Sequence, residues 1–266
     1  MGSEKRSAGP GGGAPAGAEK VWVEKFQKLN NGNPRVCQET FEWLWRYEGH
    51  FIPHSANWLI WKVEQQKARW NIERYTPSCI AVAAASHGAM FFSINGFDEK
   101  PLPTKDKANK EIKRRGHLHL DFDSKGDIGL ALQDLRTLVF NILPRYDINP
   151  SNIPIYFSGS KGFHATVFDV CLRLEKGRTI LSRIYYEIAR KFKREIPTLD
   201  LSLYKWGYGQ MYRLPNIKRS TGLHKIPLRS SEIAADGLTV NDILELAKSP
   251  RLIALPPIPK GGNSDG

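Results

Sequence analysis

The segment from Gly116 to Asp123 carries the residues best suited to chemistry. Because the side chains of a β-strand alternate between its two faces, this segment divides into an apolar face and a polar face. The apolar face would hold Leu118, Leu120 and Phe122, and the polar face would hold His117, His119, Asp121 and Asp123. The Cα atoms of Asp121 and Asp123 would then lie about 6.6 Å apart along the strand. At that separation both carboxylates can converge on one or two divalent cations. The alternative is an edge strand whose polar face is solvated.

A second candidate is the glycine-rich segment Ser-Gly-Ser-Lys-Gly-Phe-His, residues 158–164, between two predicted strands. Glycine allows backbone amides to approach an anion closely, and Ser160, Lys161 and His164 add a hydroxyl, a point charge and an imidazole. This combination is suited to binding a triphosphate. An ordinary hairpin turn can have the same composition, so this turn is interpreted together with the acidic strand.

Two later segments could complete such a site. Asp200, in the sequence Asp-Leu-Ser-Leu-Tyr, offers a third carboxylate for the same cations, although by itself it reads more naturally as a helix cap or a surface residue. Between Tyr212 and Leu228, cations cluster at a predicted strand–turn–strand corner that includes Arg213, Lys218 and Arg219. The alternative for this segment is a basic hairpin on the solvent side.

The composition favours a globular protein with a polyanionic partner. The chain has 266 residues, of which 41% are hydrophobic, and its 39 Lys and Arg against 27 Asp and Glu give a net charge of +12. Nucleic acid is the first candidate for such a partner. Three widely spaced cysteines predict no disulfide framework, and no apolar segment is long enough for a membrane span or a signal-peptide core. We therefore expect a soluble protein that is not secreted.

The rest of the sequence predicts the elements that position these groups. Strands are expected at 69–75, 79–84, 89–95, 153–158, 163–170, 199–204, 211–214 and 223–228. Helices are expected after Thr40, over 127–143 with Asp127 as N-cap, over 178–194, and from a Thr239–Asp242 capping box to about residue 248. Because strands and helices do not alternate strictly, we expect an α+β fold with a central mixed or antiparallel sheet.

Composition also suggests how the chain is divided. Residues 1–20 read as a disordered tail or a remnant of an expression vector, residues 21–252 as a single domain, and residues 253–266 as a flexible C-terminal tail. The single domain would contain an N-terminal module over about 21–110 and a module with the acidic strand over about 111–252. Aromatic residues interleaved with cations in the N-terminal module can stack bases and bind phosphates, or pack a helical core.

In this order, the four segments resemble the motifs of the archaeo-eukaryotic primase superfamily, the primase-polymerases of plasmid, phage and CRISPR-associated type. The D-x-D strand is similar to the first motif of that family, and Ser160 to His164 to its second, in the longer form S-G-x-x-G-x-H. Asp200 is similar to the third carboxylate. The Arg-Leu-Pro segment followed by Lys-x-x-Thr-Gly resembles the stretch after that carboxylate. The resemblance covers about residues 115–228.

The resemblance implies a fold, a site and an activity. The fold would be a central sheet like that of an RNA-recognition motif, flanked by helices and an N-terminal α/β module. Two Mg²⁺ or Mn²⁺ ions would be bound by the catalytic carboxylates Asp121, Asp123 and Asp200. The incoming nucleotide would be bound by Ser160, Lys161, His164, Arg213, Lys218 and Arg219. The activity would be template-dependent nucleotidyl transfer, as a DNA primase, a DNA polymerase or both, acting on nucleoside triphosphates, a primer and a single-stranded DNA template.

The implied setting is DNA replication. In a prokaryote the protein would be cytoplasmic, associated with the nucleoid or with the replication of a mobile element, and in a eukaryote it would be nuclear. Its partners would be a larger replicase, a helicase or CRISPR-associated proteins. The sequence contains no recognisable zinc-binding module, which several members of the family use in priming, so primer extension is a firmer expectation than priming.

Two alternative functions use the same residues differently. An end-joining repair polymerase shares the first two motifs and fills breaks instead of starting chains. A non-catalytic DNA-binding module for replication initiation would use only the basic surface. Three carboxylates repel DNA phosphates unless cations neutralise them, which favours an enzyme over a simple DNA-binding module.

Overall fold

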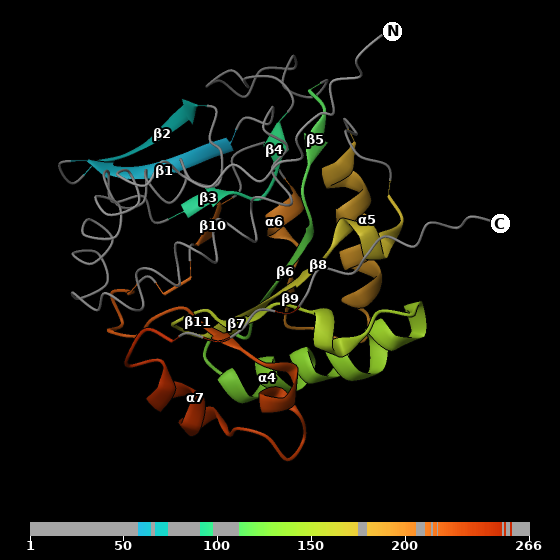
Figure 1. Cartoon of the computed structure of the whole chain (residues 1–266), viewed down its shortest axis with the longest axis vertical. Helices are drawn as coiled ribbons and strands as arrows, with labels where there is room; N and C mark the ends of the chain where they lie inside the picture. Colours follow the sequence, from blue (N-terminus) through green and yellow to red (C-terminus); the bar gives the residue numbers. More distant parts are fainter. Residues whose placement is uncertain are drawn as a thin grey trace, which may run out of the picture.

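The computed structural model describes residues 58–64, 67–73, 91–97, 112–174, 180–205, 211–213, 215–216, 218–251, 253 and 256. These residues form an antiparallel sheet of five strands, a second of four, a short pair of strands, and helices (Figure 1). The predicted helix after Thr40 and the predicted strand 79–84 lie outside the described residues, as do the N-terminal tail and most of the C-terminal tail. In the described part of the chain, no helix combines the length and the apolar character needed to cross a membrane.

The four-stranded sheet joins strands from distant parts of the sequence. Its order is β10-β3-β1-β2, with β1 at Trp58–Glu64, β2 at Lys67–Glu73, β3 at Phe91–Ser93 and β10 at Met211–Arg213. A separate pair of strands is formed by β4 (Gly96–Phe97) and β5 (Arg114–Arg115). Because β10 pairs with β3 more than a hundred residues earlier, the N-terminal strands and the later part of the chain form one layer.

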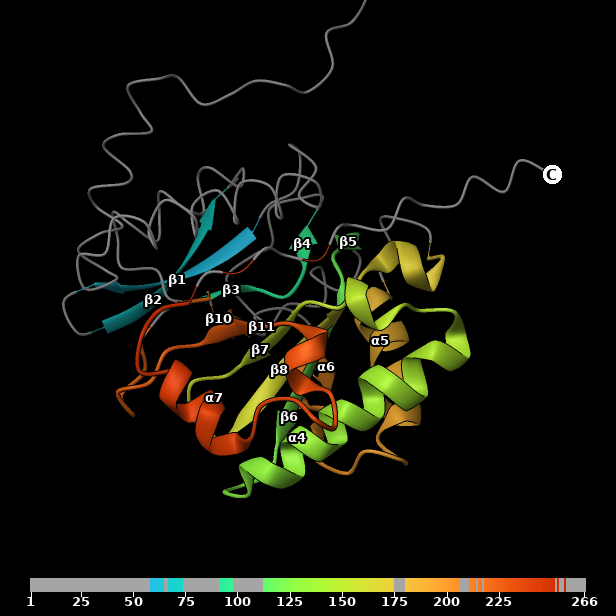
Figure 2. The same ribbon diagram turned by 60° about the horizontal axis from the view of Figure 1, so that its bottom comes forward.

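The five-stranded sheet lies in the middle of the molecule and carries the candidate site (Figures 1 and 2). Its order is β11-β7-β8-β6-β9, with β6 at Leu118–Asp123, β7 at Ile155–Phe157, β8 at Gly162–Val167, β9 at Leu199–Asp200 and β11 at Ile226–Leu228. Every neighbouring pair of strands in it is antiparallel. The predicted α+β class with an antiparallel central sheet is therefore confirmed at this level.

The predicted alternation along β6 is also confirmed, and it produces the core. Leu118, Leu120 and Phe122 are at most 1% exposed. They lie opposite the buried β8 residues Val167, Ala165 and Phe163, which are fully buried as well. The helix α4 (Ile128–Arg136) packs across β6 and β8 and buries Ala131, Leu132 and Leu135. Apolar residues of the sheet and the helix thus form one core beneath the polar face of β6.

The helices largely follow the predicted signals. Asp127 caps α4 by accepting a hydrogen bond from the Leu130 amide at 3.0 Å, and the chain continues as a π-helical segment (Thr137–Ile142) and a 3₁₀ turn (Leu143–Tyr146). The remaining helices are α5 (Leu181–Phe192), α6 (Ser202–Lys205) and α7 (Val240–Leu246). Further 3₁₀ turns lie at Pro150–Asn152, Asp169–Leu172 and Ser230–Ile233. Thr239 and Asp242 form the predicted capping box of α7.

One predicted strand is wrong over most of its length. Residues 199–204 were expected to be extended, but β9 ends at Asp200 and α6 begins at Ser202. The Asp200 carboxylate accepts hydrogen bonds from the Ser202 amide and hydroxyl, which starts a helical turn. The Tyr204 hydroxyl then lies 2.7 Å from both the amide nitrogen and the carbonyl oxygen of His119, so a side chain of α6 meets β6 where β9 has ended.

Gly162 provides a sharp test of the sheet register. A Cβ at this position would lie 1.7 Å from the Phe122 carbonyl oxygen on the neighbouring strand. We therefore expect Gly162→Ala to lower the free energy of unfolding by about 3 kcal/mol or more in urea denaturation, because strand pairing has to shift. Gly222→Ala is the matched control, since Gly222 has a φ of +86° but no neighbour within 4 Å of an added Cβ. It should lose only the ~1–2 kcal/mol of a strained backbone, and equal losses in the two variants would contradict the predicted clash.

Candidate active site

A single row of side chains crosses the polar face of the five-stranded sheet. From β11 to β9, the residues that lie directly opposite one another are Pro227, Tyr156, His164, Asp121 and Asp200. Directly opposed residues of neighbouring strands project from the same face, so the register places Asp121 between His164 and Asp200. Asp123 follows two residues later on the same face of β6. The structure therefore brings the three predicted carboxylates onto two adjacent strands.

Asp121 occupies the centre of this row. Its Oδ1 lies 3.5 Å from Nε2 of His164, and one third of its side chain remains exposed. Burial, together with the neighbouring charges of Asp200 and Asp123, raises the pKa of Asp121 to about 7. Burial also holds the pKa of His164 well below its usual range, as do the charges of Lys225 and His119. At neutral pH the imidazole is therefore uncharged, and its contact with Asp121 is not a salt bridge.

Asp123 is held by cations at the end of β6. Lys161 Nζ lies 2.8 Å from Asp123 Oδ2, and the Lys125 amide donates a hydrogen bond of 3.0 Å to Oδ1. Partial burial opposes ionisation, but the hydrogen bonds from Lys161 and Lys125 prevail and lower the pKa of Asp123. Two carboxylates that are only two residues apart thus have pKa values displaced in opposite directions.

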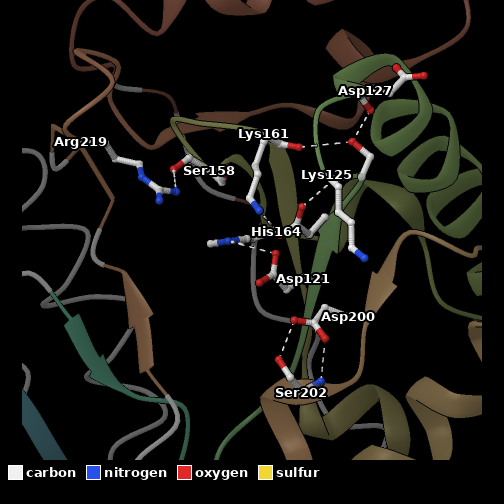
Figure 3. Close-up of polar contacts among 11 residues, drawn as sticks. Asp121, Lys125, Asp127, Ser158, Lys161, His164, Asp200, Ser202 and Arg219 are labelled. Atoms are coloured by element: carbon white, nitrogen blue, oxygen red, sulfur yellow. Dashed lines mark hydrogen bonds and ion pairs between the residues drawn. The ribbon is translucent and has the colours of Figure 1, made fainter.

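Asp200 points along β9 to the start of α6. Its Oδ1 accepts from the Ser202 amide at 2.8 Å and its Oδ2 from the Ser202 hydroxyl at 2.6 Å (Figure 3). The segment before it is anchored by Thr198, whose amide and hydroxyl both donate to the buried Asp134 carboxylate of α4 at 2.7 Å. The Thr198 carbonyl in turn accepts from the Asp123 amide at 2.9 Å. The position of Asp200 is therefore fixed from both α4 and β6.

The three carboxylates are chemically suited to bind a divalent metal ion, but two of them are turned toward other partners. Oxygen donors from Asp are those that Mg²⁺ and Mn²⁺ prefer, and Asp121 and Asp200 lie directly opposite one another. Among the described residues, however, no group of three or more His, Cys, Asp or Glu side chains stands ready to hold a metal ion. The reason is visible in the contacts, because Asp123 faces Lys161 and Asp200 faces Ser202. These two side chains would have to rotate to share an ion with Asp121.

The glycine-rich turn lies beside the carboxylates. It joins β7 to β8 and is closed by a 2.9 Å hydrogen bond from the Ser158 amide to the Gly162 carbonyl. Ser160 is half-buried in the turn, whereas Lys161 is about half exposed and reaches across to Asp123. Gly159 has a φ of +78°, and an added Cβ would come within about 3.0 Å of the backbone of His224 and Lys225. The turn is therefore packed directly against the segment that contains these two residues.

That segment closes what we call the cationic loop, residues 213–225. Arg219 Nη1 donates to the Ser158 carbonyl at 3.4 Å (Figure 3). The Thr221 hydroxyl donates to the Gly159 carbonyl at 2.7 Å, so the loop is tied to the glycine-rich turn at two places. Lys218 is exposed and forms an isolated bridge with His224. Burial and, to a lesser degree, the nearby charge of Arg219 lower the pKa of Arg213 to about 10.

The six residues predicted to bind a nucleotide thus lie on two segments that touch one another. Ser160, Lys161 and His164 belong to the glycine-rich turn and the start of β8, and Arg213, Lys218 and Arg219 belong to the cationic loop. Which of them contacts a nucleotide stays a prediction.

The two histidines expected on the polar face are both buried. His119 Nδ1 lies 3.0 Å from the Thr166 hydroxyl, and its ring packs against the Tyr212 ring with centroids 4.5 Å apart. His117 Nδ1 accepts a hydrogen bond from the Asp169 amide at 3.1 Å. His119 therefore packs on the Tyr212 ring that also contacts His164, whereas His117, just before β6, contacts Asp169 and Phe168. Sequence alternation alone does not distinguish these buried positions from exposed ones.

Sequence reasoning missed two buried charged residues that support the site. Asp134 and Lys225 read as ordinary polar residues of a helix surface and of a basic segment, yet each is at most 6% exposed. For Asp134 a signal was available, because it lies in helical spacing with the buried Ala131 and Leu135. For Lys225 the sequence offered no such signal, because Lys225 lies among other cations of the same segment and no residue pattern marks it as the buried one.

Comparison with known proteins gives a distant likeness in backbone structure. No known protein family matches the sequence, and no curated protein is similar to it. A solved structure described as "Polymerase Domain from Mycobacterium tuberculosis Ligase D in complex with DNA" is similar, with 13% identity and a TM-score of 0.48 over 82% of this chain and 90% of that one. At this identity and TM-score, the likeness says nothing about activity, and any proposal about activity depends on the residues of the chain itself.

Burial of Asp121 beside two other carboxylates should measurably lower the free energy of unfolding when Asp121 is ionised. Because its folded pKa of about 7 exceeds the value of 3.8 for a free side chain, ionisation of Asp121 opposes folding increasingly between pH 4 and pH 7, and fully above that. In metal-free buffer at pH 8, Asp121→Asn should therefore raise the free energy of unfolding, by on the order of 1 kcal/mol given the partial exposure of the side chain. The gain should vanish near pH 4.

Asp123→Asn is the control for this measurement, since the pKa of Asp123 is lowered and its ionised form stabilises the fold. This variant should be less stable than the wild type at pH 8. A loss of stability in Asp121→Asn at the same pH would show that repulsion among the carboxylates does not limit the fold.

Proposed function

We propose that this protein is a template-dependent nucleotidyltransferase, a DNA primase or DNA polymerase, that joins nucleoside triphosphates with two divalent metal ions. The observation that supports it is the order of groups across one sheet face: Asp200, Asp121 and His164 lie in one row, with Lys161 and Arg219 beside it. An anionic half suited to metal ions thus adjoins a cationic half suited to phosphates. Nucleotidyl transfer requires both halves at one place.

The anionic half would be Asp121, Asp123 and Asp200. Two Mg²⁺ or Mn²⁺ ions, when bound, would lower the pKa of a primer 3′-hydroxyl and neutralise the triphosphate. The present partners of these carboxylates are compatible with that role, because the ion pair with Lys161 and the hydrogen bonds from Ser202 break when an aspartate rotates. Once Asp123 turns away, the Lys161 ammonium is available to a phosphate oxygen.

The cationic half would bind the triphosphate. Lys161 and Arg219 supply charge close to the carboxylates, while Ser160 and the uncharged His164 supply hydrogen bonds without adding charge. Arg213, at the start of the cationic loop, lies close enough to Arg219 for the charge of Arg219 to lower its pKa. The exposed Lys218 and the net charge of +12 suit contacts with the phosphates of a template strand.

A nucleotide incorporation assay tests this proposal. Purified protein is given a labelled nucleoside triphosphate and single-stranded DNA, with or without an annealed primer, in Mg²⁺ or Mn²⁺, and ribo- and deoxynucleotides are compared. We expect metal-dependent extension of the primer. Products without a primer would identify a primase, and preferential filling of short gaps in broken ends would favour the end-joining alternative. Binding of DNA without divalent metal and without any incorporation would overturn the proposal in favour of a DNA-binding module.

Replacing two carboxylates should separate catalysis from folding. We expect the double variant Asp121→Asn, Asp123→Asn to lose incorporation by at least about two orders of magnitude, because the metal ligands are neutralised while the strand is kept. The rate is measured by primer extension under saturating nucleotide.

The matched control is the double variant Asp147→Asn, Asp236→Asn, which removes the same charge from two exposed aspartates outside the site. Its rate should stay within about twofold of the wild type, since surface substitutions away from a site have small effects. Normal extension by the first variant would remove Asp121 and Asp123 from the proposed mechanism.

A further inference from the structure

A lysine lies in the interior beneath the candidate site. Lys225, just before β11, is 0% exposed. An amine deprived of water is unfavourable unless protein groups replace the water, and burial accordingly holds the pKa of Lys225 well below its usual range. The charge of Arg213 lowers that pKa further and the carboxylate of Asp121 opposes the shift. A lysine in such a place has to be explained by what it contacts.

The contacts of Lys225 join the two sheets. Its Nζ donates a 2.7 Å hydrogen bond to the Arg213 carbonyl at the end of β10, and it lies 3.6 Å from the centroid of the Tyr212 ring and 4.7 Å from that of Tyr156. Its own carbonyl accepts a 2.6 Å hydrogen bond from the Asn216 amide. Lys225 is therefore bonded through both its side chain and its backbone to the opposite end of the cationic loop.

These contacts lead directly to groups of the candidate site. Arg213 begins the cationic loop, which goes on to Lys218 and Arg219. The Tyr212 ring that lies against Lys225 also packs on the His164 ring, with centroids 4.9 Å apart, and His164 is the neighbour of Asp121 in the row. One buried amine thus touches both the base of the loop and the aromatic ring beneath the imidazole.

We propose that Lys225 is a positioning residue for phosphate binding, which closes the cationic loop and fixes the guanidinium of Arg213 by holding its backbone carbonyl. This inference rests on the proposed function in taking Arg213 as a phosphate ligand. Packing alone does not require a lysine here, since an apolar side chain of similar length fills the same space without a desolvation cost. What such a side chain lacks is a donor for the Arg213 carbonyl.

A double-mutant cycle between Lys225 and Arg213 tests the inference. The variants are Lys225→Met, which keeps the length and removes the amine, Arg213→Ala, and the combination of the two. Affinity for inorganic tripolyphosphate with Mg²⁺ is measured by calorimetry, and KM and kcat for the nucleotide are measured by primer extension. Lys248→Met is the matched control, because Lys248 is an exposed lysine just after α7 that pairs with Glu245.

We expect Lys225→Met to weaken tripolyphosphate binding about tenfold and to raise KM similarly, with a smaller change in kcat. In the Arg213→Ala background, Lys225→Met should cause no further loss, because the residue acts through Arg213. The thermal stability of Lys225→Met should equal or exceed that of the wild type, whereas a purely structural role would lower it. Lys248→Met should bind and react as the wild type does.

Each other result overturns the inference. Unchanged tripolyphosphate affinity in Lys225→Met, absence of tripolyphosphate binding by the wild type, or additive losses in the double variant would show that Lys225 does not act through Arg213. Failure of both Lys225→Met and Lys225→Gln to fold would show that the amine is needed for the fold itself. Failure of the proposed function is a separate outcome: the wild type would incorporate no nucleotide, while tripolyphosphate binding still depended on Lys225.

Discussion

The arrangement of the site depends on two aspartates that lie directly opposite one another on neighbouring strands, Asp121 on β6 and Asp200 on β9. Like charges in such a pair repel, and Asp123 adds a third negative charge on the same face. The structure relieves the repulsion by different means at each carboxylate. Asp121 is partly protonated near neutrality, Asp123 is neutralised by Lys161, and Asp200 turns to hydrogen-bond donors on Ser202. A fold selected for stability alone has no reason to assemble such a pair, and in the proposed function these carboxylates would receive a cation.

The same constraint explains why the site is built from two layers. The strands that carry the carboxylates are fixed from below by the apolar core and by the Asp134 carboxylate of α4, which holds the segment leading to Asp200. The arginine at the start of the cationic loop comes instead from β10, which pairs within the four-stranded sheet. The Tyr212 ring, which packs on His164 and His119, and the amine of Lys225 are among the contacts between β10 and the five-stranded sheet. Arg213 is thus supplied by a different sheet from the carboxylates and Lys161, and its distance from them is determined by packing between the two sheets.

Much of this could be predicted from the sequence where the signal is local. The period-two alternation of 118–123 gave the buried and polar faces of β6, and the capping residues Asp127 and Thr239 gave the starts of α4 and α7. The prediction was wrong where a side chain competes with the backbone pattern: after Asp200 the carboxylate starts a helix, although the residue types favour a strand. The Asp123 carboxylate is turned by Lys161, 38 residues later, and Lys225 is turned inward by Arg213, 12 residues earlier, and by Tyr156, 69 residues earlier. The Asp200 carboxylate is turned by hydrogen-bond donors of Ser202, whose use residue spacing does not encode. Such features follow from the tertiary structure and not from any pattern of residue types.

In the proposed enzyme, Lys161 connects the binding of metal to the binding of nucleotide. Its ammonium contacts Asp123 in this structure, and it belongs to the same turn as Ser160. An ion that takes the Asp123 carboxylate also releases this lysine, which then has no partner as favourable as a phosphate oxygen. Conversely, a triphosphate that takes Lys161 leaves Asp123 uncompensated and increases its affinity for a cation. Because coupling between two ligands is reciprocal, each would strengthen the binding of the other, and a metal–nucleotide complex would bind better than either component alone. The repulsion among the carboxylates would therefore be relieved most completely when the substrate is present.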